Sequence, residues 1–216
     1  MEPESPRISR IDTQQHDPQR VSIFVDGEFA LGVHIDLLAR EGLHVGAVLH
    51  ESDVARLTAL DEFYRARTLA MSFVAFQARS CHEVRQRLRK ADFQEEVIDQ
   101  VVERLLENRY LDDAAYSLTY ARDRFRVRDY GPRRIRSDLM RKGIDSQLIA
   151  AAIEELSDSE MDETVERLAM KRWQALSREE DLYRRKSKTF DFLLRRGYSY
   201  DQVREAVERV ARDSVS

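Results

Sequence analysis

The chain has 216 residues, of which 35% are charged, seven are glycine and four are proline, and its formal net charge is −4. This composition favours a helix-rich protein with a buried core over a β-sandwich or a disordered chain. The longest apolar runs fall well short of the roughly 18 residues of a membrane span. We therefore expect a soluble cytoplasmic protein with no membrane partner. The single cysteine, Cys81, excludes a disulfide within the chain, and we expect it to face the core, with a reactive thiol as the alternative.

The N-terminal part of the chain has the composition of a small β-rich head. Residues 1–6 contain acids and prolines, which argues against a signal peptide and predicts a disordered tail. Residues 7–13 and 21–25 have strand composition. The pair Asp26-Gly27 follows the second strand and precedes residues 28–33, which predicts a β-hairpin with a type I′ turn.

A short helix and then a long helix complete residues 7–60, the predicted head. Residues 34–40 read as a helix that Gly42 ends. The long helix is expected to start near Ser52 and to continue to about Arg79, with a break possible within it. From there to the C-terminus the pattern stays helical.

An internal repeat dominates the rest of the sequence. Three stretches align with each other: EVRQRLRKADFQEEVIDQVVERL (83–105), RIRSDLMRKGIDSQLIAAAIEEL (134–156) and TFDFLLRRGYSYDQVREAVERV (189–210). Equivalent apolar positions are Leu88, Leu139 and Leu193, then Phe93, Ile144 and Tyr198, then Ile98, Ile149 and Val203. Another amphipathic helix precedes each stretch, so the repeat predicts three modules of three helices, which span 61–112, 113–157 and 158–216.

The predicted fold class is therefore mainly α. We expect a tandem of three three-helix modules after a head that contains a β-hairpin, and stacking of the modules predicts an elongated, curved body. In each module a turn joins the two aligned helices. Gly143 and Gly197 suit a left-handed conformation at this turn, whereas the first module has Ala91, so its turn is expected to differ or to close at Asp92.

Motifs of catalysis and metal binding are not found in the sequence. The five histidines lack metal-ligand spacing, and there is no phosphate-binding glycine loop, nucleophile elbow or zinc-protease motif. Asp112 and Asp113 stand at a predicted helix start, where capping is a better explanation than a catalytic carboxylate pair. We expect no enzyme activity, no metal and no cofactor.

The second module carries an excess of positive charge. Residues 115–142 hold three acids and nine bases, namely Arg122, Arg124, Arg126, Arg128, Arg133, Arg134, Arg136, Arg141 and Lys142. The apolar stripe of its first helix is expected to consist of Ala114, Leu118, Ala121 and Phe125. Arginine binds phosphate and carboxylate with two parallel hydrogen bonds, so the bases predict a surface for nucleic acid or for an acidic protein, with a solvated charged face as the alternative. A weaker cluster in the third module consists of Arg184, Arg185, Lys186 and Lys188.

Three motifs in order resemble the RecX family, the bacterial regulators of the recombinase RecA. They are ENRYLDDAAY (107–116), YGPRRIRSDLMRKGID (130–145) and FLLRRGYSYDQVREAV (192–207), and DGEFALG (26–32) resembles the strand-rich head of longer members. Three positions depart from the family pattern. Arg109 stands where Gly is usual, Tyr116 where Phe is usual, and Ala91 in place of the first turn's Gly.

The resemblance implies a non-enzymatic, monomeric regulator that binds RecA filaments on single-stranded DNA and restrains their extension, with effects on recombination, DNA repair and the SOS response. It also implies direct binding of single-stranded, and possibly double-stranded, DNA. One alternative is a sequence-independent DNA-binding module that affects RecA only by competing for DNA. Another is an enzyme with an unrecognised site.

Overall fold

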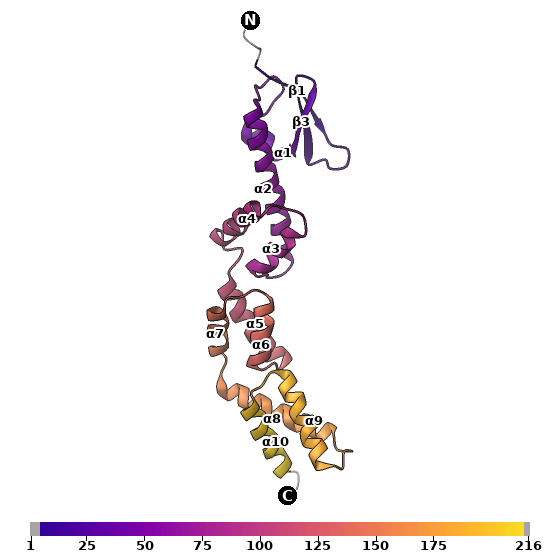
Figure 1. Cartoon of the computed structure of the whole chain (residues 1–216), viewed down its shortest axis with the longest axis vertical. Coiled ribbons are helices and arrows are strands. Elements are labelled where there is room, and N and C mark those ends of the chain that lie inside the picture. Colours follow the sequence, from indigo (N-terminus) through magenta and orange to yellow (C-terminus); the bar gives the residue numbers. More distant parts are fainter. Residues whose placement is uncertain (1–4, 214–216) are drawn as a thin grey trace. The chain divides into compact units, whose positions relative to one another are not determined.

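The computed structural model describes residues 5–213, which form three strands and ten helices (Figure 1). The elements in chain order are β1 (Ile8–Thr13), β2 (Arg20–Val25), β3 (Glu28–His34), α1 (Ile35–Glu41), α2 (Glu51–Phe76), α3 (Cys81–Arg89), α4 (Glu95–Glu107), α5 (Asp113–Arg128), α6 (Pro132–Arg141), α7 (Ser146–Glu154), α8 (Asp158–Ala175), α9 (Leu182–Arg196) and α10 (Tyr200–Asp213). The expected fold class, a mainly helical chain with a small β-rich head, is confirmed. The predicted disordered tail of residues 1–6 lies largely outside the described residues.

The chain divides into two compact units. Unit 1 comprises the residues up to Gln77 together with Val84–Tyr110, and unit 2 comprises Ala78–Glu83 together with the residues from Leu111 onward. Each unit has its own buried core. The predicted curvature of the tandem stays a prediction.

In unit 1, the three strands form one antiparallel sheet in the order β1-β2-β3. The predicted hairpin is confirmed, because Asp26 has φ 49° and Gly27 has φ 91°, both in the left-handed region that a type I′ turn requires. Alternate strand residues point to one face, so Val21, Ile23 and Val33 are buried together against Leu37 of α1 and Leu57 of α2. The short helix α1 ends as expected, with Gly42 at φ 65°.

A buried ion pair attaches the sheet to α2. The Asp61 side chain is 5% exposed and accepts hydrogen bonds of 3.1 and 2.8 Å from the Arg20 guanidinium. It also accepts a 2.9 Å bond from the backbone N–H of His34, at the end of β3. The carboxylate thus has three donors, which offsets the cost of its burial.

The long helix α2 is continuous from Glu51 to Phe76, so the possible break is absent and the helix ends earlier than expected. It also begins earlier, with His50 rather than Ser52 at its N-terminal boundary, and the Asp53 carboxylate accepts the His50 backbone N–H at 3.1 Å. Its C-terminal half, with α3 and α4, provides the three helices of the first module. This half of α2 places Ala66 and Ala70 among the fully buried residues.

In unit 2, two further three-helix groups follow one another. The helices α5, α6 and α7 surround a core that includes Phe125, Ile135 and Leu139. The helices α8, α9 and α10 surround another, which includes Trp173 and Tyr198. Among the described residues the predicted nine helices of the three modules are therefore all present.

The turn between the aligned helices is left-handed in all three modules. The positive φ falls on Asp92 (60°), Gly143 (71°) and Gly197 (94°), which confirms that the first turn closes at Asp92 rather than at Ala91. Glycine is required for a second reason in the later copies. A Cβ on Gly143 would lie 2.4 Å from Cβ of His82, and one on Gly197 would lie 2.4 Å from the backbone nitrogen of Arg134. Asp92 is exposed, so a side chain fits there.

Candidate binding surface

The helix α5 carries four of the predicted binding arginines, and its N-terminus is capped as expected. The Asp112 carboxylate accepts the N–H of Ala115 at 2.9 Å. Asp113 has a different role, because it accepts the backbone N–H of Cys81 at 2.9 Å and so caps the start of α3. Cys81 itself is half-buried rather than a full core residue. Asp112 thus caps the helix start at which it stands, as expected, whereas Asp113 caps the start of another helix.

The buried stripe of α5 differs from the predicted one. Ala114 is exposed and Leu118 is only half-buried, whereas Ser117 is buried beside Ala121 and Phe125. The hydroxyl of Ser117 donates to the carbonyl of Ala114 at 2.8 Å, so burial leaves no polar group unsatisfied. The prediction of Ala114 was wrong because it placed only apolar residues at helical spacing in the stripe and so passed over the polar Ser117.

Three of the nine bases form ion pairs, partly with acids far away in the sequence. Arg122 pairs with Glu155 at 3.2 Å, Arg141 pairs with Asp138, and Lys142 pairs with Glu83 at 2.8 Å. Two of these three acids lie outside residues 115–142. Counting only the acids within that segment therefore overestimated its free positive charge.

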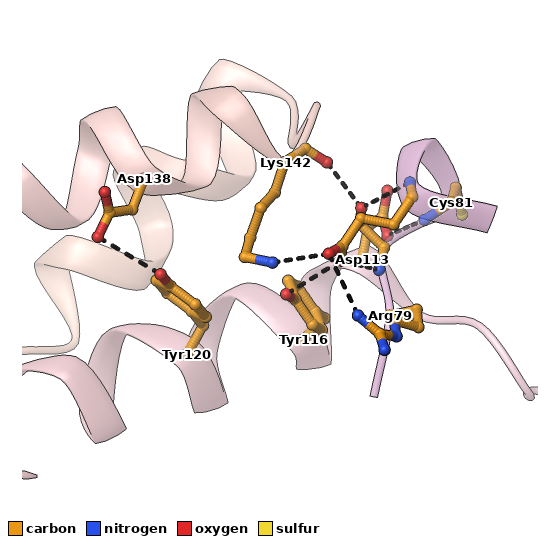
Figure 2. Close-up of polar contacts among 9 residues, drawn as sticks. Arg79, Cys81, Asp113, Tyr116, Tyr120, Asp138 and Lys142 are labelled. Carbon is orange, nitrogen blue, oxygen red and sulfur yellow. Dashed lines mark hydrogen bonds and ion pairs between the residues drawn. The ribbon is translucent and has the colours of Figure 1, made fainter. Parts of the chain in front are cut away.

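Lys142 belongs to a polar cluster that connects the C-terminus of α6 with the segment Ala78–Glu83 (Figure 2). Glu83 accepts from the Lys142 ammonium, from the Ser80 backbone N–H at 3.1 Å and from the Tyr116 hydroxyl at 3.3 Å. The Ser80 hydroxyl in turn donates to the Lys142 carbonyl at 2.6 Å. We name these four residues, Ser80, Glu83, Tyr116 and Lys142, the clasp.

The electrostatics of the clasp favour the charged pair. Burial acts to raise the pKa of Glu83, but the hydrogen bonds from Lys142 and Ser80 outweigh it, so this pKa lies below its ordinary value. Burial acts to lower the pKa of Lys142, yet its bonds with Glu83 and Tyr116 raise that pKa. Lys142 is therefore held as a cation by an internal partner and is not available as a free binding charge.

Two further arginines lie over tyrosine rings. The Arg124 guanidinium is 4.7 Å from the ring centre of Tyr120, and that of Arg134 is 3.8 Å from the ring centre of Tyr130. Arg134 also donates to the carbonyl of Arg195 at the end of α9, at 3.4 Å. These cation–π contacts orient the two guanidinium groups within the fold but leave their positive charge in place.

The remaining four arginines have no carboxylate within ion-pair distance in the part of the chain that the structure describes. This free quartet consists of Arg126, Arg128, Arg133 and Arg136. All four are exposed. Arg126 and Arg128 lie in the last turn of α5, and Arg133 and Arg136 lie in the first half of α6 after a short turn. The quartet is what remains of the predicted cationic surface once internal pairs are removed.

The N-terminus of α6, between the two halves of the quartet, is closed by α9. The N–H of Gly131 donates to the carbonyl of Arg196 at 2.8 Å, and that of Arg133 donates to the carbonyl of Gly197 at 3.0 Å. The positive end of one helix thus meets the carbonyl end of another. A Cβ on Gly131 would lie 2.5 Å from the carbonyl carbon of Gly197, so the contact requires glycine.

The weaker basic cluster of the third module is engaged within that module. Its contacts are Arg184 with Asp181, Lys186 with Glu208, Lys188 with Glu179, and Arg185 with the carbonyl and ring of Trp173. These partners come from α8, from α10 and from the loop between α8 and α9. The structure therefore gives this cluster no free charge comparable with that of the quartet.

Neither a metal site nor a membrane-spanning helix is found in the part of the chain that the structure describes. In residues 5–213, no three His, Cys, Asp or Glu side chains are grouped so that they could hold a metal ion. None of the described helices is long and apolar enough to cross a bilayer.

Family models match four consecutive parts of the chain. They are the N-terminal domain of regulatory protein RecX over residues 6–50, and the first, second and third three-helix domains of RecX over residues 66–105, 112–153 and 158–207. The chain belongs to the RecX family. The free quartet lies in the second RecX three-helix domain.

Similar RecX proteins cover nearly the whole chain. Regulatory protein RecX of Bacillus cytotoxicus is 28% identical over 94% of this chain and 76% of its own length, and that of Clostridium perfringens is 27% identical over 94% and 96%. A crystal structure of regulatory protein RecX, 26% identical, superimposes with a TM-score of 0.75 over 94% of this chain and 99% of that one. RecX from Lactobacillus salivarius gives a TM-score of 0.64 over 70% and 97%. Membership supports a regulatory role.

The departures from the RecX pattern have local structural explanations. Arg109 has φ 58°, so it occupies the left-handed conformation that the usual glycine would adopt without strain. Tyr116 keeps an aromatic ring at the position of the usual phenylalanine, and its hydroxyl donates to Glu83 in the clasp.

Proposed function

We propose that this chain is a non-enzymatic regulator that binds RecA filaments on single-stranded DNA and restrains their extension. It acts as a cytoplasmic monomer without a cofactor, and through RecA it affects recombination, DNA repair and the SOS response. The observation that carries the proposal is the exposed free quartet in the second three-helix domain of a RecX-family chain.

Binding alone is sufficient for this function. A chain that binds one state of the filament end more tightly than another shifts the equilibrium of filament assembly. No covalent bond needs to be made or broken. Guanidinium groups without internal partners can form paired hydrogen bonds with carboxylates or phosphates, and both groups are present on a nucleoprotein filament.

The test is the DNA-dependent ATPase of RecA, measured while the purified chain is added below the stoichiometry of RecA. We expect the ATPase to fall, because each bound chain affects more than one RecA subunit. An unchanged ATPase together with unchanged filament length would contradict the proposal.

A second candidate function is a DNA-binding module that affects RecA only by competing for the strand. The exposed positive charge of the quartet supports this candidate as well. Titrating naked single strands and preformed filaments in parallel, at several salt concentrations, separates the two. Equal affinity for both substrates with a steep salt dependence would favour competition, and a preference for filaments would favour the regulator.

A further inference from the structure

Two exposed aliphatic side chains lie among the free quartet. Val127, 72% exposed, stands between Arg126 and Arg128 at the end of α5. Met140, 64% exposed, follows Arg133 and Arg136 at helical spacings of seven and four, so the three share one face of α6. Each of these two segments, the end of α5 and one face of α6, therefore combines arginine with an exposed aliphatic side chain.

Aromatic rings that a nucleic-acid base could stack on are not open at this surface. In α5, α6 and α7 the exposed large hydrophobic residues are Val127 and Met140, and both are aliphatic. The tyrosines of this domain, Tyr116, Tyr120 and Tyr130, are half-buried, and each has a cation within 3.8–5.6 Å of its ring centre. Non-specific binding of single strands relies on free aromatic faces, which this surface lacks.

Backbone donors for phosphate are occupied too. A helix N-terminus beside arginines is a common phosphate site, but the N–H groups of Gly131 and Arg133 already donate to the carbonyls of Arg196 and Gly197. The hydroxyl of Ser137 accepts from Arg141 at 3.3 Å and keeps its own O–H as a donor. Phosphate at this helix start would therefore meet guanidinium groups and the Ser137 hydroxyl, without these two backbone N–H groups.

We propose that the free quartet, with Val127 and Met140, docks on an acidic and partly apolar face of a protein rather than on a nucleic-acid strand. Arginine and methionine are enriched in protein interfaces and lysine is depleted there, and every free cation of this surface is an arginine. Carboxylates of the partner pair with the guanidinium groups, while its apolar side chains cover Val127 and Met140. The inference rests on the proposed function and identifies the protein component of the filament as what this surface contacts.

Three full-length variants test the inference. The first changes Arg126, Arg128, Arg133 and Arg136 to Gln. The second changes Val127→Ser and Met140→Ser, which keeps every charge. The control changes Arg122, Arg184, Lys186 and Lys188 to Gln, which removes the same number of positive charges from residues that are ion-paired within the fold. Circular dichroism verifies that all three are folded.

Affinity is measured for naked single-stranded DNA and for RecA filaments over a range of salt concentrations. The quartet variant and the aliphatic variant are expected to lose at least about tenfold in affinity for filaments, relative to the control. On naked DNA, both are expected to match the control in affinity and in salt slope.

Two results would overturn the inference. One is a quartet variant whose salt slope on naked DNA is shallower than the control's by about 3, the value for four lost phosphate contacts to a single strand. The other is an aliphatic variant that binds filaments as well as the wild type. Failure of the proposed function itself is distinct, because the unmodified chain would then show no preference for filaments.

Discussion

Gly131 and Gly197 bring two backbones into direct contact, and this contact determines how α6 meets α9. Gly131 has an ordinary φ of −78°, so its need for glycine comes from space and not from backbone strain. The neighbouring hydrogen bonds to Arg196 and Gly197 depend on the same approach.

Replacing Gly131 with alanine is therefore expected to destabilise unit 2 by about 3 kcal/mol, the upper end of the usual cost of overpacking. Urea unfolding followed by the fluorescence of Trp173, the single tryptophan and a buried residue of unit 2, measures the change. The comparison is Ser157→Ala, which removes the N-cap of α8 and should cost about 1 kcal/mol. A Gly131 variant no less stable than the Ser157 variant would show that the backbones can separate freely.

Asp61 contributes to the stability of unit 1 because its carboxylate accepts hydrogen bonds from the Arg20 guanidinium and from the backbone N–H at the end of β3. Changing Asp61 to alanine leaves a largely buried guanidinium without its partner. We expect a loss of about 3 kcal/mol, seen as roughly hundredfold faster hydrogen exchange in β2 and β3. Asp12→Ala, which removes an exposed pair with Arg10, should leave that exchange nearly unchanged. Equal effects of the two variants would contradict a role for the buried pair.

The candidate site could be predicted from the sequence only in part, and the reason is visible at single residues. Periodicity and composition located the basic segment. They could not show that Lys142 meets Glu83 or that Arg122 meets Glu155, because these partners are distant in the sequence and are brought together by the fold. The free quartet can be identified only after the bases with partners inside the fold have been removed from the nine predicted ones.

At the scale of elements, the clasp holds the segment Ala78–Glu83 against α5 and the C-terminus of α6 (Figure 2). Because the folded pKa of Glu83 is below its ordinary value, its contribution to stability is present above the ordinary pKa of a glutamate. That contribution is lost as the pH falls through the lowered value. Lys142, with a raised pKa, contributes below the ordinary pKa of a lysine and loses that contribution as the pH rises through the raised value.

Glu83→Gln is therefore expected to reduce the stability of unit 2 by about 1–2 kcal/mol at pH 7, which is the range for charged hydrogen bonds after some solvent screening. The difference from the wild type should shrink as the pH falls below about 4.3. Urea unfolding at pH 7 and pH 4, again followed by Trp173, provides the measurement. Glu205→Gln, in an exposed pair with Arg209, is the control and should change little at either pH. A difference that grew on acidification would contradict the role given to the clasp.

Elements were predicted well wherever the signal is local. The Asp26-Gly27 turn, the cap at Asp112 and the left-handed turn at Asp92 each depend on a few neighbouring residues. Errors arose where tertiary contacts decide the outcome. Packing against the other helices of the module buries the side of α5 that carries Ser117 instead of Ala114, and α2 ends before Arg79.

At the scale of the whole molecule, the repeat accounts for the order of the domains, but the surfaces of these domains are not equivalent. All three modules share the left-handed turn, yet in the described residues the quartet without acidic partners is a feature of the second module, and the basic cluster of the third is paired internally. We propose that the second module provides the principal contact surface and that the other two serve mainly as scaffold.

The length of RecA filaments, measured by electron microscopy with the chain present below the stoichiometry of RecA, tests the central claim most directly. The wild type and the control variant, with Arg122, Arg184, Lys186 and Lys188 changed to Gln, are expected to shorten the filaments equally. The quartet variant is expected to leave them at the length seen without the chain, because its contact surface is lost. Filaments of unchanged length with the wild type, or equal shortening by the quartet variant, would contradict the account.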